Sequence, residues 1–472
     1  MVTNSAIGNA APTKSRPRNA LAILAGALLM LWPALLNRYP LLYPDSITYL
    51  GDGRLVARAL FLHKFSEYYG IRSFFYSLGI LPFHWNVTGW PVIVLQSLLA
   101  AYVLWLVVRS LQPRRTALHY LILVAALSLL TSMSWFVCLI MPDVLGPLLY
   151  LCIYLLVFAP ETLSRRERIA LMLIAWWGIV SHATHLMLAA GLWILLCLLF
   201  LFRLPALRGR LLAIAQIAAI LLFAAAAQLA LHAYLYGEPS LNGVRPPFLA
   251  ARVIADGPGL WYLQQHCGEP QVKRKFVLCD HLHELPQDPD EFLWGEHGVW
   301  AQADEDTEKR LRQEEVRFVL ATLRAYPRAQ LAKSAANFWH QLQLFGLYVF
   351  GPSDWMSQQF PTVLPHDRTQ YLAGRQARDD LPLEFFTSLQ YWTVAISLVV
   401  IVVLAVWMRL HRRPRLLGLA IVIVSTVLAN ALVTGVLSLV EDRLQSRIVW
   451  LVPLLAGLLL SAAFQRRHNI PD

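Results

Sequence analysis

The chain has 472 residues, of which 57% are hydrophobic and only 15% are charged. A soluble globular protein of this length carries a charge on about a quarter of its residues, so the composition excludes that class. The formal net charge of +11 is interpreted as a signal of membrane topology and of attraction to anionic lipid headgroups. We therefore expect membrane lipids as partners and no nucleic acid.

Apolar stretches long enough to cross roughly 30 Å of hydrocarbon recur along the chain. They predict an all-α polytopic membrane protein of about ten membrane-spanning helices, with an N-terminal transmembrane module (1–231), an outside loop or small domain (232–390) and a C-terminal three-helix module (391–472). The predicted spans are Ala20–Leu36, Pro91–Val108, Ala117–Val137, Val144–Phe158, Ile169–Val180, Leu186–Phe202, Leu211–Leu231, Tyr391–Met408, Leu416–Leu437 and Ile448–Phe464.

Basic residues at both ends of the chain and in every second connection predict the orientation. Cytoplasmic loops retain Lys and Arg, so we expect a multi-pass protein of the bacterial inner membrane with both termini in the cytoplasm. The residues concerned are Lys14, Arg16, Arg18, Arg109, Arg114, Arg115, Arg165, Arg166, Arg168, Arg203, Arg208, Arg210, Arg409, Arg412, Arg413, Arg415, Arg466 and Arg467.

The interiors of the predicted spans carry almost no ionisable residues. Ion-coupled transporters and channels need charges or broken helices at the membrane midplane, so transport is disfavoured. We therefore look for function on the outside face. Its first segment is the loop 37–90, where Ser46–Leu62 and Tyr68–Phe83 are expected to form helices in the membrane interface.

Asp45 opens this first outside loop as part of a Pro-Asp pair. One interpretation is structural, because an aspartate after a proline suits a helix N-cap. The other is functional: a carboxylate held at the water–lipid boundary can act as a general base on a bound acceptor. Tyr49 and Asp52, one and two helical turns further on, are candidates for binding the substrate.

Two further outside turns carry polar residues. Asp143 repeats the Pro-Asp pattern between the third and fourth predicted spans, where it could be only a helix breaker and cap. His182 and His185 follow in the next turn, either as interface residues or as ligand contacts. Since two Pro-Asp turns fall on the same side, we interpret Asp143 as a second candidate catalytic carboxylate.

Arg443 and Arg447 lie in the last outside turn, four residues apart. On a helix this spacing places both guanidinium groups on one face, near the headgroup plane, where they could clamp a phosphate or diphosphate. The alternative is anchoring to ordinary phospholipid headgroups together with pairing to Glu441 and Asp442.

The joint pattern of an acidic residue after the first span, a second acidic turn, interfacial helices and an arginine turn before a proline-containing last span resembles the GT-C glycosyltransferases. That superfamily includes protein O-mannosyltransferases, oligosaccharyltransferase catalytic subunits and aminoarabinose transferases. Asp45 matches the essential acidic residue of their first outside loop. Many members have a second acid close by, and either Asp52 or Asp143 could take that role. Some relatives use a divalent cation and others do not, so a cation stays open.

The resemblance implies an inverting transfer of a sugar from a polyprenyl-phosphate or diphosphate donor to a hydroxyl of a lipid, glycan or protein acceptor. A phosphate leaving group needs no protonation, unlike the alkoxide in glycoside hydrolysis. One base and a set of cations are therefore enough. The alternatives are a non-catalytic polyprenol or lipid carrier and a structural membrane subunit.

The segment 232–390 is the least membrane-like, and its stretch Leu331–Phe350 is expected to lie at the interface. Cys267 and Cys279 lie close together in this segment, and in an oxidising compartment we expect a disulfide between them. A zinc cluster with the neighbouring histidines is the alternative, although the spacing matches no closed zinc site well.

Overall fold

The computed structural model describes residues 16–66, 70, 72–112, 116–241 and 243–468. Helices make up most of this part of the chain, and no strand occurs within it. The all-helical fold expected from the sequence is therefore confirmed. Among the basic residues used for orientation, Lys14, Arg114 and Arg115 lie outside the described residues, as do the side chains of Arg16, Arg18, Arg466 and Arg467.

Seven helices in the described ranges are long and apolar enough to cross a membrane. They coincide with seven of the ten predicted spans, so the chain is an α-helical membrane protein, whereas a count of ten is not shown. The first and last of the seven are interrupted, as α1 (Arg16–Leu29) with α2 (Trp32–Asn37) and as α22 (Asp442–Val449) with α23 (Leu451–His468). The others are α5 (Trp90–Leu111), α10 (Ala183–Leu201), α11 (Leu211–Tyr236), α20 (Leu383–Trp407) and α21 (Pro414–Leu437).

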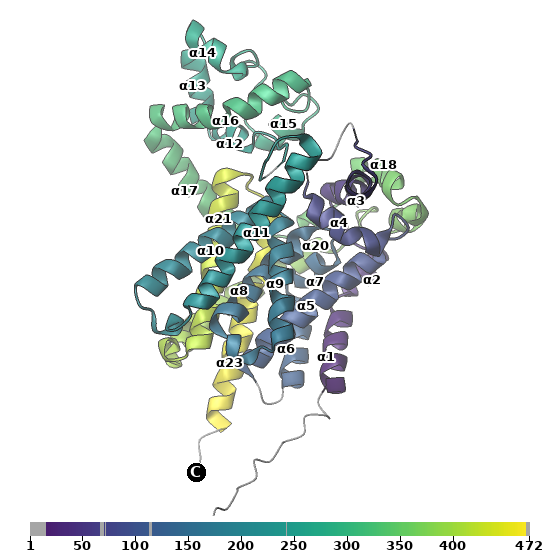
Figure 1. Ribbon diagram of the computed structural model, residues 1–472, viewed down its shortest axis with the longest axis vertical. Coiled ribbons are helices and arrows are strands. Elements are labelled where there is room, and N and C mark those ends of the chain that lie inside the picture. The colour runs from purple at the N-terminus through teal and green to yellow at the C-terminus, as the bar shows by residue number, and fades with distance from the viewer. Residues whose placement is uncertain (1–15, 67–69, 71, 113–115, 242, 469–472) are drawn as a thin grey trace, which may run out of the picture.

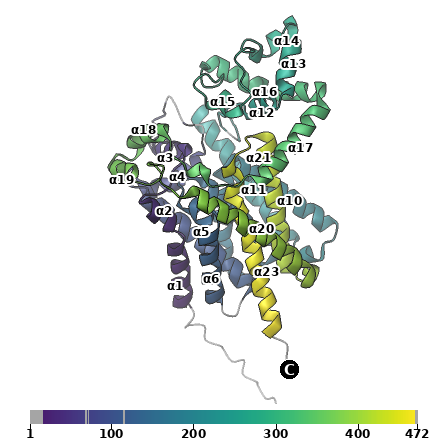
Figure 2. The ribbon, with the colours of Figure 1, turned by 180° about the vertical axis from the view of Figure 1, so that it is seen from behind.

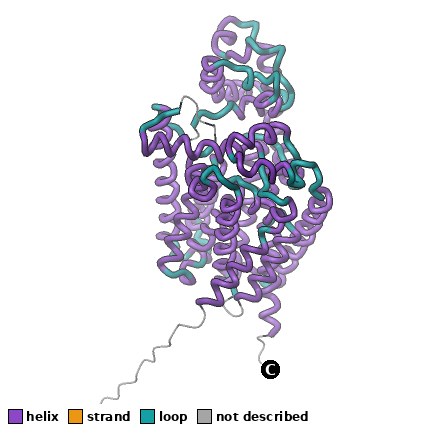
Figure 3. The backbone as a smooth tube through the Cα atoms, turned by 90° about the vertical axis from the view of Figure 1, so that its right-hand side faces the viewer, coloured by secondary structure: helices purple, strands orange, loops and turns teal. Residues whose placement is uncertain are grey.

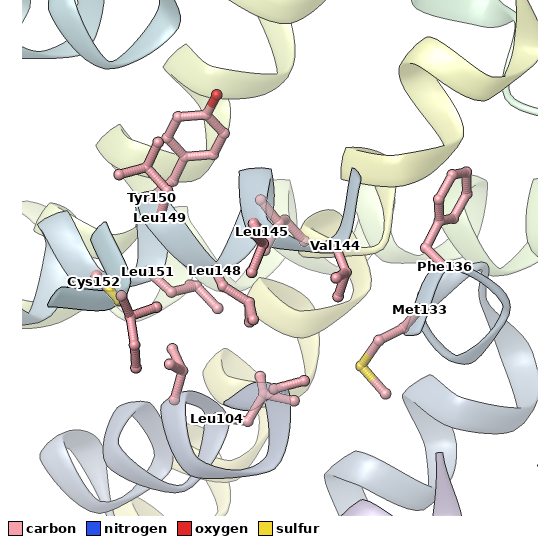
Figure 4. Packing of buried hydrophobic residues seen from close by; sticks show 14 of the residues in the cluster. Leu104, Met133, Phe136, Val144, Leu145, Leu148, Leu149, Tyr150, Leu151 and Cys152 are labelled. Carbon is pink, nitrogen blue, oxygen red and sulfur yellow. The ribbon is translucent and has the colours of Figure 1, made fainter. Parts of the chain in front are cut away.

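The three remaining predicted spans are shorter helices: α6 (Thr116–Leu130), α8 (Leu145–Phe158) and α9 (Arg165–Val180). At 1.5 Å per residue, the 14 residues of α8 extend about 21 Å, less than the hydrocarbon core. Every residue of α8 is buried, and Figure 4 shows its side chains, Leu148 among them, packed toward Leu104 of α5. The apolar run of α8 therefore faces protein rather than lipid, and its crossing of the bilayer stays a prediction.

The segment predicted to be the first outside loop forms two helices that pack against each other, α3 (Pro44–Leu62) and α4 (Phe74–His84). The first agrees with the expected interfacial helix Ser46–Leu62. The second begins later than expected, and Tyr68 lies outside the described residues. Both helices lie at one end of the bundle, on the side from which further helices project (Figure 1).

A small helical unit, which we call the projecting unit, stands beyond that end of the bundle (Figures 1 and 3). It has its own apolar cluster, which extends from Ala250 to Phe318. A disulfide joins Cys267 to Cys279, as expected from their spacing. The helices of the projecting unit are α12 (Phe248–Ala255), α13 (Pro258–His266), α14 (Pro270–Lys275), α15 (Pro289–Trp294) and α16 (Glu305–Ala325).

The chain returns from the projecting unit to the bundle through α17 (Pro327–Gln343), which packs against α21 (Figure 2). A Cβ at Gly435 of α21 would lie 2.8 Å from the carbonyl oxygen of Asn337, so this close approach requires a glycine. Next, α18 (Asp354–Val363) packs on α3, followed by α19 (Arg368–Leu372). We call the end of the bundle that carries these elements the domain-bearing end.

Candidate functional site

The two predicted acidic turns are brought together by one isolated β-bridge. It pairs Leu41 with Leu139 in parallel, through backbone hydrogen bonds of 2.9 and 3.0 Å. Asp45 follows this bridge by four residues, and so does Asp143. Because parallel segments run in the same direction, both aspartates arrive at the domain-bearing end.

Asp45 lies in the first turn of α3, and its carboxylate faces two arginines. Arg72 Nη2 is 2.6 Å from Oδ1, and Arg443 Nη1 is 3.6 Å from Oδ2. The helix begins at Pro44, with Tyr43 at the N-cap position, so the alternative interpretation of Asp45 as the helix cap is wrong. Proline is pre-organised for the first position of a helix, which places Asp45 inside the first turn. Its side chain pairs with the arginines.

Arg443 enters the site from α22, between an aromatic ring and two carboxylates. Its guanidinium carbon is 4.1 Å from the centre of the Tyr43 ring, within the range of a cation–π contact. Its Nε is 3.8 Å from Glu441 Oε2, and the Tyr43 hydroxyl donates to Glu441 at 3.3 Å. Only 10% of the Arg443 side chain is exposed, yet Nε and Nη1 have no hydrogen-bond partner. Its charge is compensated, but these two nitrogens donate no hydrogen bond.

Arg447, one turn further along α22, pairs with the second acidic turn in the interior. Its Nη1 is 3.3 Å from Asp143 Oδ1, and its Nη2 donates to Thr184 Oγ1 and to Asn430 Oδ1, each at 3.3 Å. Neither side chain of the Arg447–Asp143 ion pair has exposed surface. The i, i+4 spacing does bring Arg443 and Arg447 to the same region, but the Arg447 side chain is enclosed by protein and paired with Asp143 rather than exposed to a lipid headgroup.

The histidine turn lies beside this inner ion pair. The Thr184 backbone N–H donates to His182 Nδ1 at 3.2 Å, and the Thr184 hydroxyl is 2.8 Å from the same nitrogen. His185 Nδ1 lies 2.8 Å from the Gly178 carbonyl oxygen, whereas its buried Nε2 has no partner. The two imidazole centres are 5.1 Å apart. Thr184 therefore connects the predicted histidine pair with Arg447.

Tyr49 belongs to the site, and Asp52 does not. Tyr49 is buried on α3, edge-on to Tyr76 at 4.9 Å; burial and the nearby Asp45 carboxylate raise the pKa of its phenol, so it remains a hydrogen-bond donor. Asp52 lies about 10 Å further along α3, where it accepts a hydrogen bond from the Gly70 backbone at 3.3 Å. Burial raises the pKa of Asp52 to about 7.

Three residues that the sequence analysis did not assign to the site complete its outer part. Arg72 precedes α4 and was assigned only to the interface, but α3–α4 packing brings it to Asp45. Trp294 of α15 lies 5.7 Å from the Arg72 guanidinium. Asp290, in the same helix, is electrostatically coupled to Glu441, and burial together with that carboxylate raises the pKa of Asp290 to about 6. The projecting unit therefore reaches the site through α15.

The acidic residues here are poorly suited to a divalent cation. Among the described residues, no group of three or more His, Cys, Asp or Glu side chains is placed to hold a metal ion. Asp45 and Asp143 each face an arginine, whose positive charge opposes a metal ion. The alternative zinc cluster of the projecting unit also loses two ligands, because Cys267 and Cys279 are joined in the disulfide.

No family model, no curated protein and no solved structure matches this chain. The class that the fold defines is an α-helical membrane protein. Any narrower statement about its function depends on the chemistry of the residues at the domain-bearing end.

Proposed function

We propose that the protein is an inverting glycosyltransferase that moves a sugar from a polyprenyl-phosphate or polyprenyl-diphosphate donor to an acceptor hydroxyl. The observation that carries this proposal is the placement of Asp45 between Arg72 and Arg443 at one end of a bundle of apolar helices. A carboxylate and two guanidinium groups are the parts that such a transfer needs. The apolar bundle is a suitable environment for a polyprenyl tail.

In this reaction the acceptor oxygen attacks the anomeric carbon, and the bond from that carbon to the phosphate oxygen breaks. Asp45 takes the proton of the acceptor hydroxyl. The bonding electrons leave with the phosphate, whose growing negative charge is stabilised by Arg443, while Arg72 holds the Asp45 carboxylate in place. Direct attack inverts the anomeric configuration. The Arg447–Asp143 pair lies deeper and holds α22, and hence Arg443, against the histidine turn.

We further propose that the domain-bearing end faces the periplasm of a bacterial inner membrane, with both termini in the cytoplasm. Support comes from the basic connections at the opposite ends of the predicted spans. A disulfide in the projecting unit also suits an oxidising compartment. The acceptor is then a lipid, glycan or protein of the cell envelope.

A non-catalytic polyprenol or lipid carrier is the second candidate. One observation favours it: both oxygens of Asp45 face arginines, as in an anion-binding site whose only task is to hold a phosphate. A third candidate is a structural subunit that presents the projecting unit to a partner, and it needs no chemistry at Asp45.

Asp45→Asn tests the enzyme against both alternatives, because it removes the base while keeping the size of the side chain. The variant and the wild type are expressed in a strain that lacks the gene, and its lipids and cell-envelope glycans are profiled. We expect a loss of transfer of at least about 100-fold, the usual contribution of a general base. Asp52→Asn, on the same helix but away from the arginines, is the matched control and should retain transfer. Full transfer by folded Asp45→Asn protein would refute Asp45 as the base.

A further inference from the structure

Both carboxylate oxygens of Asp45 face an arginine. Its Oδ1 is 2.6 Å from Arg72 and its Oδ2 is 3.6 Å from Arg443. A base needs an oxygen within hydrogen-bonding distance of the hydroxyl it deprotonates. An acceptor hydroxyl therefore has to approach an oxygen that already faces a guanidinium group, and it does so more easily when one of the two contacts opens.

The two arginine contacts differ in strength. The Arg72 contact has the length of a strong charge-assisted hydrogen bond. The Arg443 contact, at 3.6 Å, is beyond hydrogen-bonding distance, and so is the 3.8 Å contact of Arg443 with Glu441. The contact to Arg443 is therefore the one that opens at lower cost.

Arg443 also has the features of an anion receptor without its anion. Its side chain is nine-tenths buried, one face lies on the Tyr43 ring, and Nε and Nη1 make no hydrogen bond. Buried donors without a partner are unfavourable, because they have lost water and gained no hydrogen bond in exchange. Phosphate oxygens can accept charge-assisted hydrogen bonds from these donors, whereas the nearby carboxylates are too far away.

We propose that Asp45 stands in for the donor phosphate on Arg443, and that phosphate binding displaces it and leaves it on Arg72 as a positioned base. This inference rests on the proposed function and adds an order of events to it. The donor binds first, and Oδ2 of Asp45 becomes available to the acceptor only afterwards. Arg72 is a positioning residue, held by its short contact with Oδ1 and by Trp294.

The exchange has a consequence that an ordinary binding site lacks: the base competes with the substrate. Removing the charge of Asp45 should therefore strengthen phosphate binding while it abolishes transfer. The competing contact joins two mostly buried side chains, but at 3.6 Å it makes no hydrogen bond, so we assign it only about 1 kcal/mol, the upper end of the range for weak ion pairs. We expect a decrease of about fivefold in the Kd for a phosphate ligand.

The test measures the affinity of the full-length protein in nanodiscs for a long-chain polyprenyl phosphate without a sugar. Asp45→Asn should bind about fivefold more tightly than the wild type, and Asp45→Ser should show the same direction if the asparagine variant fails to fold. Asp52→Asn is the matched control and should leave the Kd unchanged. Arg443→Gln should weaken binding. Arg72→Lys should lower kcat with little change in the Kd, because it moves the base and not the phosphate site.

Two comparison lipids identify what Arg443 binds. The corresponding polyprenol, without phosphate, should bind the wild type and Asp45→Asn equally. Asp45→Asn should increase the affinity for phosphatidic acid less than it increases the affinity for polyprenyl phosphate. An equal increase for both lipids would mean that Arg443 binds ordinary lipid headgroups and would overturn the inference. An unchanged or higher Kd for polyprenyl phosphate in both Asp45 variants would also overturn it. Failure of the wild type to bind polyprenyl phosphate better than polyprenol would instead refute the proposed donor.

Discussion

Replacement of the buried aspartate, Asp143→Asn, should be strongly destabilising. The change leaves the Arg447 guanidinium without a counter-charge, at a position where neither side chain is exposed. Loss of one partner of a buried ion pair costs about 3–5 kcal/mol. The asparagine keeps an acceptor oxygen and Thr184 and Asn430 keep theirs, so we expect the lower value, about 3 kcal/mol.

A double-mutant cycle separates the pair from the packing around it. Arg447→Gln alone should cost a similar amount, because it leaves the Asp143 carboxylate buried and unpaired. If the two losses were independent they would add to about 6 kcal/mol, whereas Asp143→Asn with Arg447→Gln should lose only about 3. The four proteins are purified in detergent and heated, and the fraction of each protein that stays monodisperse is measured. This fraction ranks the stability of the four proteins.

An exposed ion pair provides the control for this cycle. Asp280 lies 3.8 Å from Lys273, and 49% of the Asp280 side chain is exposed. Asp280→Asn should therefore change stability by no more than about 0.5 kcal/mol. Additive losses in the Asp143 and Arg447 cycle would contradict the buried contact, and with it the placement of α22 against the second acidic turn.

Three further predictions follow from the described contacts. The pKa of Asp52 is raised from 3.8 to about 7 in the folded protein, so the protonated carboxyl group favours the folded state. The wild type should therefore lose stability relative to Asp52→Asn as the pH rises from about 4 to about 7. A constant difference in melting temperature over that range would contradict the raised pKa. Thiol labelling of the denatured protein should modify Cys138, Cys152 and Cys197 before reduction and five cysteines after it; five before reduction would contradict the disulfide. Gln341 holds Glu441 through two hydrogen bonds of 2.9 Å to its backbone. Gln341→Ala should therefore raise the Kd for polyprenyl phosphate several-fold without changing the protein fold. An unchanged Kd would show that α17 does not support the phosphate site.

Several parts of the site follow from local sequence. Asp45, Asp143, His182 and Arg443 each lie near the end of an apolar stretch. Because basic residues occur in every second connection between the predicted spans, all four are predicted to lie on the same side of the membrane. The structure brings these four residues together at the domain-bearing end. Prolines and charges mark the ends of helices through local steric and solvation effects, and for this reason such positions can be predicted without the fold.

The partners of these residues could not be predicted in the same way. Arg72 reaches Asp45 only because α3 and α4 pack against each other, and Arg443 comes from nearly 400 residues further along the chain. The helix start at Pro44, which excludes the interpretation of Asp45 as a cap, was likewise not predicted. No spacing rule connects residues so far apart, since pairing depends on which helix faces meet.

The sequence by itself determined that this chain is a helical membrane protein with its unusual polar residues at one end of the spans, because hydropathy and charge act residue by residue. Only the tertiary structure decided which apolar helices face protein rather than lipid. The fully buried α8 shows why: lipid tails and packed leucines are equally apolar, so composition does not distinguish them. The tertiary structure also decided that Arg447 is an interior ion-pair partner, while Arg443 keeps unused donors. Burial and pairing depend on the neighbours that the fold supplies.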